Sequence, residues 1–89
     1  MHHYERLLQQ LRTRFNGYLS WLSMCTKADV KIVPTGVGNA FQLVATWGEG
    51  QEYRKTYDAA TALRQGRARC VRDYARVFIE EVLKERGVL

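Results

Sequence analysis

The apolar residues of this chain change their spacing twice, and this change restricts the fold more than any other feature of the sequence. From Tyr4 onward they recur every three or four residues, which is the spacing of one face of an α-helix. The series comprises Leu7, Leu8, Leu11, Phe15, Tyr18, Leu19 and Leu22. We predict an amphipathic helix over about residues 3–25, continuous through Asn16-Gly17 because the apolar residues stay in phase across that pair.

The middle of the chain has the pattern of half-buried β-strands, because apolar and polar residues alternate there. Glycine-rich turn sequences, PTGVGN and WGEGQE, interrupt the alternation twice. We therefore predict three strands, over about residues 29–34, 40–47 and 52–57, joined as an antiparallel meander.

A second helix follows the strands. Asp58 is a good N-cap residue, helical spacing returns after it, and Gly87 provides a stop, so we predict a helix over about residues 59–86. The order is α-β-β-β-α. The expected fold class is α+β, with a three-stranded antiparallel sheet packed against two amphipathic helices in a single domain of 89 residues. Two helices this apolar on one small sheet leave surface that a homodimer would bury.

The composition excludes several classes of protein. Apolar residues make up 46% of the chain and there is one proline, which is typical of a folded protein. No apolar run approaches the ~18 residues of a membrane span, and the first residues lack the apolar segment of a secretory signal. We expect a cytoplasmic protein with no membrane partner.

The segment RQGRARCVRDYAR, residues 64–76, contains five arginines and one aspartate, and so carries +4 where the whole chain carries +5. On a helical wheel Arg69, Arg72 and Arg76 point away from the apolar arc, with Gln65 one turn earlier. Arginine at this spacing suits phosphate or carboxylate recognition, because its planar fork donates paired hydrogen bonds and keeps its charge.

The alternative for this segment is a solvated helix face whose charges pair with one another. Asp73 lies four residues after Arg69, and Glu80 lies four residues after Arg76, which is the spacing of ion pairs along a helix. The sequence leaves both interpretations open.

The third strand is a second candidate surface. Tyr53, Arg54 and Lys55, with Tyr57 as a second aromatic residue, combine aromatic and basic side chains beside a glycine-bearing turn, as on platforms that bind single-stranded nucleic acid. The alternative is that the tyrosines are half-buried sheet residues.

The sequence predicts no catalytic residue, no cofactor and no metal site. The Gly36-Val37-Gly38 stretch lacks the third glycine of a dinucleotide fingerprint and leads into a strand. Asp29-Val30-Lys31 matches a fragment of some metal-dependent nuclease sites, without a second acidic residue nearby. His2 and His3 have no further ligand at zinc-binding spacing.

The element order resembles the double-stranded RNA-binding domain, in which a helix, a three-strand meander and a second helix bind duplex RNA by shape. In that family a Lys-Lys-x-Ala-Lys sequence begins the last helix, whereas this chain has Asp58-Ala59-Ala60-Thr61-Ala62 there, so the phosphate clamp is missing. The stretch FQLVATWGEGQEYRKTYDAATA also resembles the DNA-binding domain of phage integrases.

From these features we expect a non-enzymatic basic binding protein whose arginine-rich second helix engages an acidic partner, with nucleic acid as the leading candidate. The alternative partner is an acidic protein surface. In that case the chain would be an inhibitor or adaptor in the style of phage-encoded antagonists such as anti-CRISPR proteins, an analogy of size and charge, with Trp21, Met24, Arg69 and Arg72 as contact candidates.

Overall fold

The computed structural model describes residues 2–61 and 71–89 and confirms the α+β fold class. Its main elements are α1 (His2–Thr26), β1 (Asp29–Pro34), β2 (Phe41–Trp47), β3 (Gln51–Tyr57) and α3 (Val71–Glu85). A short helical turn at residues 59–61 follows β3.

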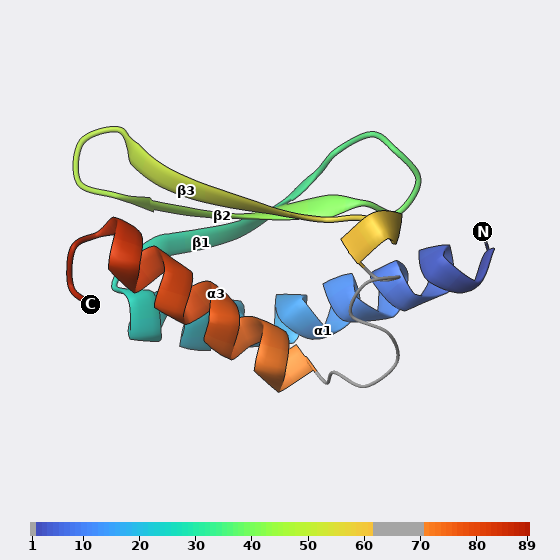
Figure 1. The fold of residues 1–89 in the computed structure, drawn as a ribbon, viewed down its shortest axis with the longest axis horizontal. Coiled ribbons are helices and arrows are strands. Elements are labelled where there is room, and N and C mark those ends of the chain that lie inside the picture. Colours follow the sequence, from blue (N-terminus) through green and yellow to red (C-terminus); the bar gives the residue numbers. More distant parts are fainter. Residues whose placement is uncertain (1, 62–70) are drawn as a thin grey trace.

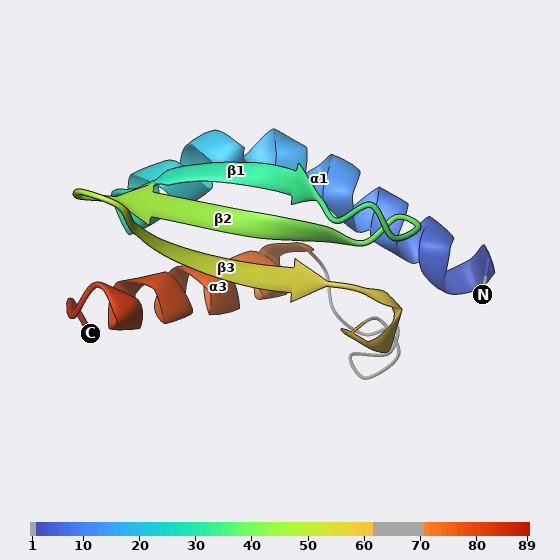
Figure 2. The same ribbon diagram turned by 90° about the horizontal axis from the view of Figure 1, so that it is seen from above.

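Both long helices lie against the same face of the sheet, so the molecule has two layers (Figure 1). The strands are antiparallel and adjacent in the order β1-β2-β3. Seen from above the sheet, α1 lies on the β1 side and α3 on the β3 side (Figure 2). The two helices run in the same direction, and no described helix covers the other face of the sheet.

The helix α1 is unbroken through Asn16 and Gly17. Leu8, Phe15 and Leu22 lie seven residues apart along it and are all buried. Burial of such side chains stabilises the fold by roughly 1.5–3 kcal/mol each, which outweighs the ~1 kcal/mol that a glycine costs within a helix. Although α1 has 25 residues, neither it nor any other described helix is apolar enough over a sufficient length to cross a membrane.

Three fully buried aromatic rings join the two layers. Phe15 of α1 contacts Phe41 of β2 and Tyr57 of β3, with ring centroids 6.0 and 5.2 Å apart. Phe41 and Tyr57 are cross-strand partners, and their rings stack at 5.2 Å. The helix α3 adds the buried side chains of Val71, Ala75, Phe78 and Val82. The core therefore lies between one face of the sheet and both helices.

The predicted second helix is described in two parts, the turn at residues 59–61 and α3. Asp58 caps the first part, because its carboxylate accepts a hydrogen bond from the Thr61 backbone N–H at 2.8 Å. The two parts do not share one axis in either view (Figures 1 and 2). Residues 62–70 lie outside the described residues.

The end of α3 is set by Gly87, which has a φ of 77°. The N–H of Val88 bonds the Leu83 carbonyl at 2.9 Å, and the N–H of Gly87 bonds the Lys84 carbonyl at 3.0 Å. This pair of bonds is the Schellman motif, which favours glycine at the left-handed position.

Arg86 joins the C-terminal ends of the two long helices. Its Nη1 donates a hydrogen bond to the Thr26 carbonyl at 2.5 Å and a longer one to the Lys27 carbonyl at 3.3 Å. A cation is favourable here because the C-terminal end of α1 carries partial negative charge. The guanidinium also lies 6.0 Å from the centre of the Trp47 ring. We call this set of contacts the Arg86 clamp.

Replacing Arg86 with alanine should destabilise the protein by about 2 kcal/mol, because it removes charged hydrogen bonds to the end of α1. Denaturant unfolding followed by tryptophan fluorescence measures the change. Lys84→Ala is the matched control, since it removes the same charge from an exposed position two residues earlier. Equal losses in the two variants would show that the clamp adds no stability.

Candidate functional site

The uncovered face of the sheet carries side chains from all three strands. The register arranges them in three rows, Asp29–Thr46–Glu52, Lys31–Val44–Arg54 and Val33–Gln42–Thr56. Val44 is buried at the centre of this face. Its cross-strand neighbours are the long side chains of Lys31 and Arg54, whose aliphatic stems can cover an apolar residue while their charged ends stay in water.

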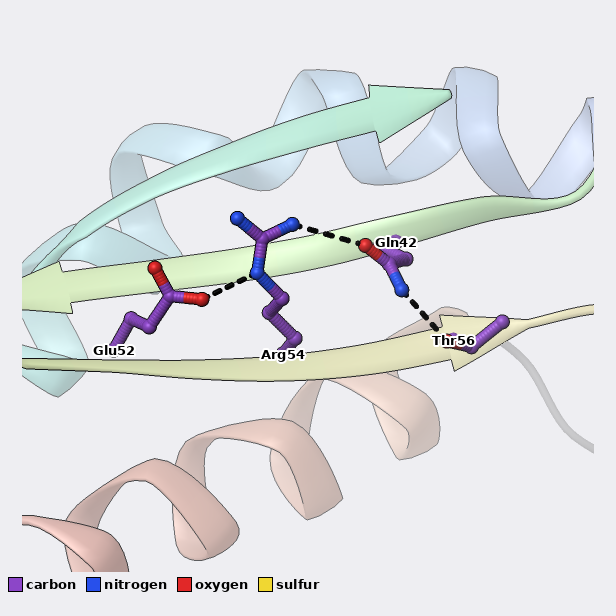
Figure 3. Close-up of polar contacts among 4 residues, drawn as sticks. All are labelled: Gln42, Glu52, Arg54 and Thr56. Atoms are coloured by element: carbon purple, nitrogen blue, oxygen red, sulfur yellow. Dashed lines mark hydrogen bonds and ion pairs between the residues drawn. The ribbon is translucent and has the colours of Figure 1, made fainter. Parts of the chain in front are cut away.

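The basic side chains of this face are paired within the face itself. Arg54 donates through Nε to the Glu52 carboxylate and through Nη1 to the Gln42 amide oxygen at 3.1 Å, as Figure 3 shows. The Gln42 amide in turn donates to the Thr56 hydroxyl at 3.0 Å. Lys31 Nζ lies 3.5 Å from an Asp29 carboxylate oxygen.

This pairing makes the uncovered face electrically balanced. Its two cations, Lys31 and Arg54, each have a carboxylate on the neighbouring residue of the same strand face. Exposed pairs of this kind contribute at most about 1 kcal/mol to stability, but a neutralised cation gives little attraction to a polyanion. Arg54 is thus placed on a surface with no excess positive charge.

The other two residues that the sequence singled out on β3 point to the helix side of the sheet. Lys55 Nζ lies 2.5 Å from a Glu81 carboxylate oxygen of α3, and both side chains are partly shielded from solvent. The Tyr53 ring contacts Phe78 of α3, with centroids 5.9 Å apart. The alternation of β3 therefore separates Tyr53 and Lys55 from Arg54, and the three residues do not form one surface.

The tyrosines on this side of β3 resist ionisation. Burial, followed by the negative charge of Glu81, raises the pKa of Tyr53 to about 12. Burial is also the largest cause of the raised pKa of Tyr57, whose hydroxyl has no hydrogen-bond partner among the described residues.

Two contacts show which sides of α3 face its neighbours. Glu81 pairs with Lys55, so the Glu81 side faces β3. Arg86 reaches the end of α1. At about 100° per residue, Arg86 lies roughly 140° around the helix axis from Glu81, so this second side faces α1. Ile79 and Leu83 belong to the Arg86 side and are half-buried there.

The charged residues of α3 also differ between the side that faces α1 and the rest of the helix. Arg72 and Arg76 continue the stripe that Leu83 and Arg86 define, at spacings of three and four residues through Ile79. The rest of the circumference, from the solvent side round to β3, carries one further cation, Lys84, and all four acidic residues of the helix: Asp73, Glu80, Glu81 and Glu85. The α1-facing stripe of α3 is therefore purely basic in its charges.

Arg72 and Arg76 are both exposed, and within residues 2–61 and 71–89 neither forms an ion pair. The pairing of Arg76 with Glu80, which the sequence offered as an alternative, does not form. Arg69 and Gln65, the other predicted members of this stripe, lie outside the described residues, as does the expected pairing of Arg69 with Asp73.

The flank of α1 that faces α3 carries a third arginine. On the opposite flank the Ser23 hydroxyl accepts a hydrogen bond from the Val30 N–H at 3.2 Å, and the Glu5 carboxylate lies beside Gly38, so that flank faces β1 and its following loop. The α3-facing flank consists of Arg14, Tyr18, Trp21 and Cys25, at spacings of four and three residues.

The Arg86 clamp places the three arginines at a similar level along the two helices. Arg14 lies 12 residues before Thr26, and Arg72 and Arg76 lie 14 and 10 residues before Arg86. At 1.5 Å per residue they are about 18, 21 and 15 Å from the clamp. We call Arg14, Arg72 and Arg76 the arginine cluster.

Arg14 was not a candidate from the sequence, although its signal is visible there. The first 26 residues carry three arginines and one glutamate, and Arg14 lies on the border between the apolar and polar sides of the first helix. A residue at such a border faces whichever neighbour packs on that flank, and the sequence does not identify the neighbour.

Among the described residues no group of three or more His, Cys, Asp or Glu side chains could hold a metal ion. Comparisons of the chain with protein-family models, curated proteins and solved structures gave no match.

The raised pKa values of Tyr53 and Tyr57 predict a loss of stability in alkali. Both hydroxyls keep their protons to a higher pH in the folded protein than in the unfolded chain, whose tyrosines ionise near pH 10. This contribution is complete below pH 10 and is lost as pH rises through the folded pKa, which for Tyr53 is about 12. Tyr57→Phe should therefore unfold less readily than the unaltered protein above pH 10.

At neutral pH, Tyr57→Phe should be at least as stable as the unaltered protein, because it removes a buried hydroxyl without a partner. Thermal unfolding at pH 7 and at pH 10.5 measures both effects. Tyr18→Phe is the matched control for loss of a hydroxyl from a half-buried ring. A destabilised Tyr57→Phe at pH 7 would contradict this account of the core.

Proposed function

We propose that this protein is a non-enzymatic nucleic-acid-binding protein that contacts the phosphate backbone through the arginine cluster. The observation that carries the proposal is the separation of charge around α3, where Arg72 and Arg76 are exposed, form no ion pair within the described residues and lie on the side toward α1. Guanidinium groups gathered at one level of a helix pair repel one another, and a phosphate placed among them relieves that repulsion.

The chemistry of arginine supports a phosphate ligand. Its planar fork donates two parallel hydrogen bonds to phosphate and remains charged at any ordinary pH, so recognition needs no change of protonation. A nucleic acid offers such groups in a row, and the cluster combines two arginines along α3 with one on α1. The uncovered sheet face is a weaker candidate because each of its cations has an adjacent carboxylate. We place the binding in the cytoplasm.

A second candidate is a protein partner, for an inhibitor or adaptor in the style of a phage-encoded antagonist. Met24 is 74% exposed and Trp21 is 36% exposed on the outer part of α1, and exposed aromatic residues beside arginines are typical of interface hot spots. This candidate takes the place of the first if the protein binds no nucleic acid.

Replacing both Arg72 and Arg76 with glutamine should weaken binding to a fluorescently labelled oligonucleotide about tenfold or more at low salt. Each lost phosphate contact should also flatten the plot of log affinity against log salt concentration, by about 0.7 for a single strand or about 0.9 for a duplex. Fluorescence anisotropy at four or five salt concentrations measures both quantities.

The matched control is Lys31→Gln with Arg54→Gln, which removes the same total charge from the uncovered sheet face. If both double variants lose affinity equally, net charge and not the arginine cluster governs the binding. Absence of binding by the unaltered protein to DNA and RNA at low salt would refute the proposed function.

A further inference from the structure

An aromatic residue continues the α1 side of the arginine cluster. Trp21 lies on the same flank of α1 as Arg14, two turns farther along, and keeps 36% of its surface exposed. At 1.5 Å per residue it is about 8 Å from the clamp along the helix axis, compared with about 15 Å for Arg76. The exposed indole and the nearest arginine of α3 are therefore separated by only about 8 Å along the pair of helices.

The structure holds the Trp21 ring in place from one side. The Tyr18 ring meets it edge to face, with centroids 5.8 Å apart and planes inclined by 62°. This arrangement is the favoured geometry for two aromatic rings, and it limits the positions that the indole adopts before any ligand arrives.

Open space lies beside the same turn of the helix. Side chains on a helix lean toward its N-terminus, so the Trp21 side chain leans toward the turn that contains Gly17. A methyl group added at Gly17 would meet no atom of residues 2–61 and 71–89 within 4 Å. In the part of the chain that the structure describes, a flat ligand therefore has room to approach the indole from this side.

We propose that Trp21 is a stacking site for an unpaired nucleobase, and that the ligand of the arginine cluster is consequently single-stranded nucleic acid. The proposal rests on the proposed function, because the cluster supplies the phosphate contacts that bring a base to Trp21. A duplex hides the faces of its bases within its own stack, whereas a single strand exposes them to aromatic side chains.

The two kinds of contact have separate consequences. Phosphate contacts at Arg14, Arg72 and Arg76 give affinity that falls with salt for every nucleic acid. Stacking on Trp21 adds affinity only where a base face is exposed, by a factor of roughly 5 to 150 per base, since such stacking contributes about 1–3 kcal/mol and tenfold corresponds to 1.4 kcal/mol.

The test compares three oligonucleotides of equal length: a single strand, the same strand with abasic sites along its length, and a duplex. All three carry phosphates, but only the first exposes base faces. With the unaltered protein we expect the single strand to bind at least fivefold more tightly than the abasic strand and to quench tryptophan fluorescence. In the Trp21→Ala variant, the affinity for the single strand should fall to the affinity for the abasic strand. In the Trp21→Phe variant, part of the difference between the two affinities should return.

Trp21→Ala should leave the slope of affinity against salt unchanged, because it removes no phosphate contact, whereas loss of fold would reduce binding to every oligonucleotide. Circular dichroism checks that each variant is folded, and the comparison of the intact and abasic strands in the unaltered protein needs no variant.

Equal affinity for the single strand, the abasic strand and the duplex would overturn the stacking site while leaving the proposed function in place. Absence of binding to all three would overturn both. The alternative is that a second copy of the chain covers Trp21. In that case the unaltered protein would sediment as a dimer and the Trp21→Ala variant as a monomer, and this result would also overturn the stacking site.

Discussion

The structure depends on a three-stranded sheet with one apolar face, which the two long helices of the described residues cover. Both long helices lie on that face, and the rings of Phe15, Phe41 and Tyr57 fill the space between the layers. No described helix covers the opposite face, which carries paired charges and an amide-hydroxyl network beside the apolar side chains of Val33 and Val44. Because those charges pair with each other, the excess positive charge of the chain lies elsewhere.

The placement of that excess follows from how α3 is held. Lys55 and Glu81 connect one side of the helix to β3, and Arg86 connects another side to the end of α1. Because two sides of α3 are fixed, the helical repeat sets the direction of its other residues, and Arg72 and Arg76 lie on the side of α3 toward α1. The Arg86 clamp joins the two helices, and these arginines and Arg14 lie at similar axial distances from it. Stability and the proposed binding surface thus share one set of contacts.

Much of the fold can be predicted from the sequence, because the spacing of the apolar residues indicates which side of each helix or strand is buried. The spacing of the apolar residues predicted α1 through Gly17, and the glycine turns predicted the meander. The continuity of the second helix between Thr61 and Val71 stays a prediction, since Asp58 and Gly87 mark only its two ends. The strand alternation places Tyr53 and Lys55 on the side of β3 opposite Arg54, so the single surface predicted from these three residues does not form. It could not show that a glutamate on α3 would pair with Lys55, because that pairing joins residues 26 positions apart.

The candidate site was less predictable, for a related reason. Arg72 and Arg76 were identified because an arginine-rich helical stripe is visible in one segment of sequence, whereas Arg14 belongs to a different helix and joins them only through the register of α1 and α3. The same argument applies to Trp21, which the sequence offered as a contact candidate for a protein partner without indicating which residues lie beside it. The neighbours of an edge residue depend on which helix packs there and in which direction. Here α1 and α3 run parallel, and the helical repeat puts Trp21 and the arginine cluster on the sides of the two helices that face each other. This combination is the basis of our proposal of a ligand with both phosphates and unpaired bases, in place of a purely anionic one.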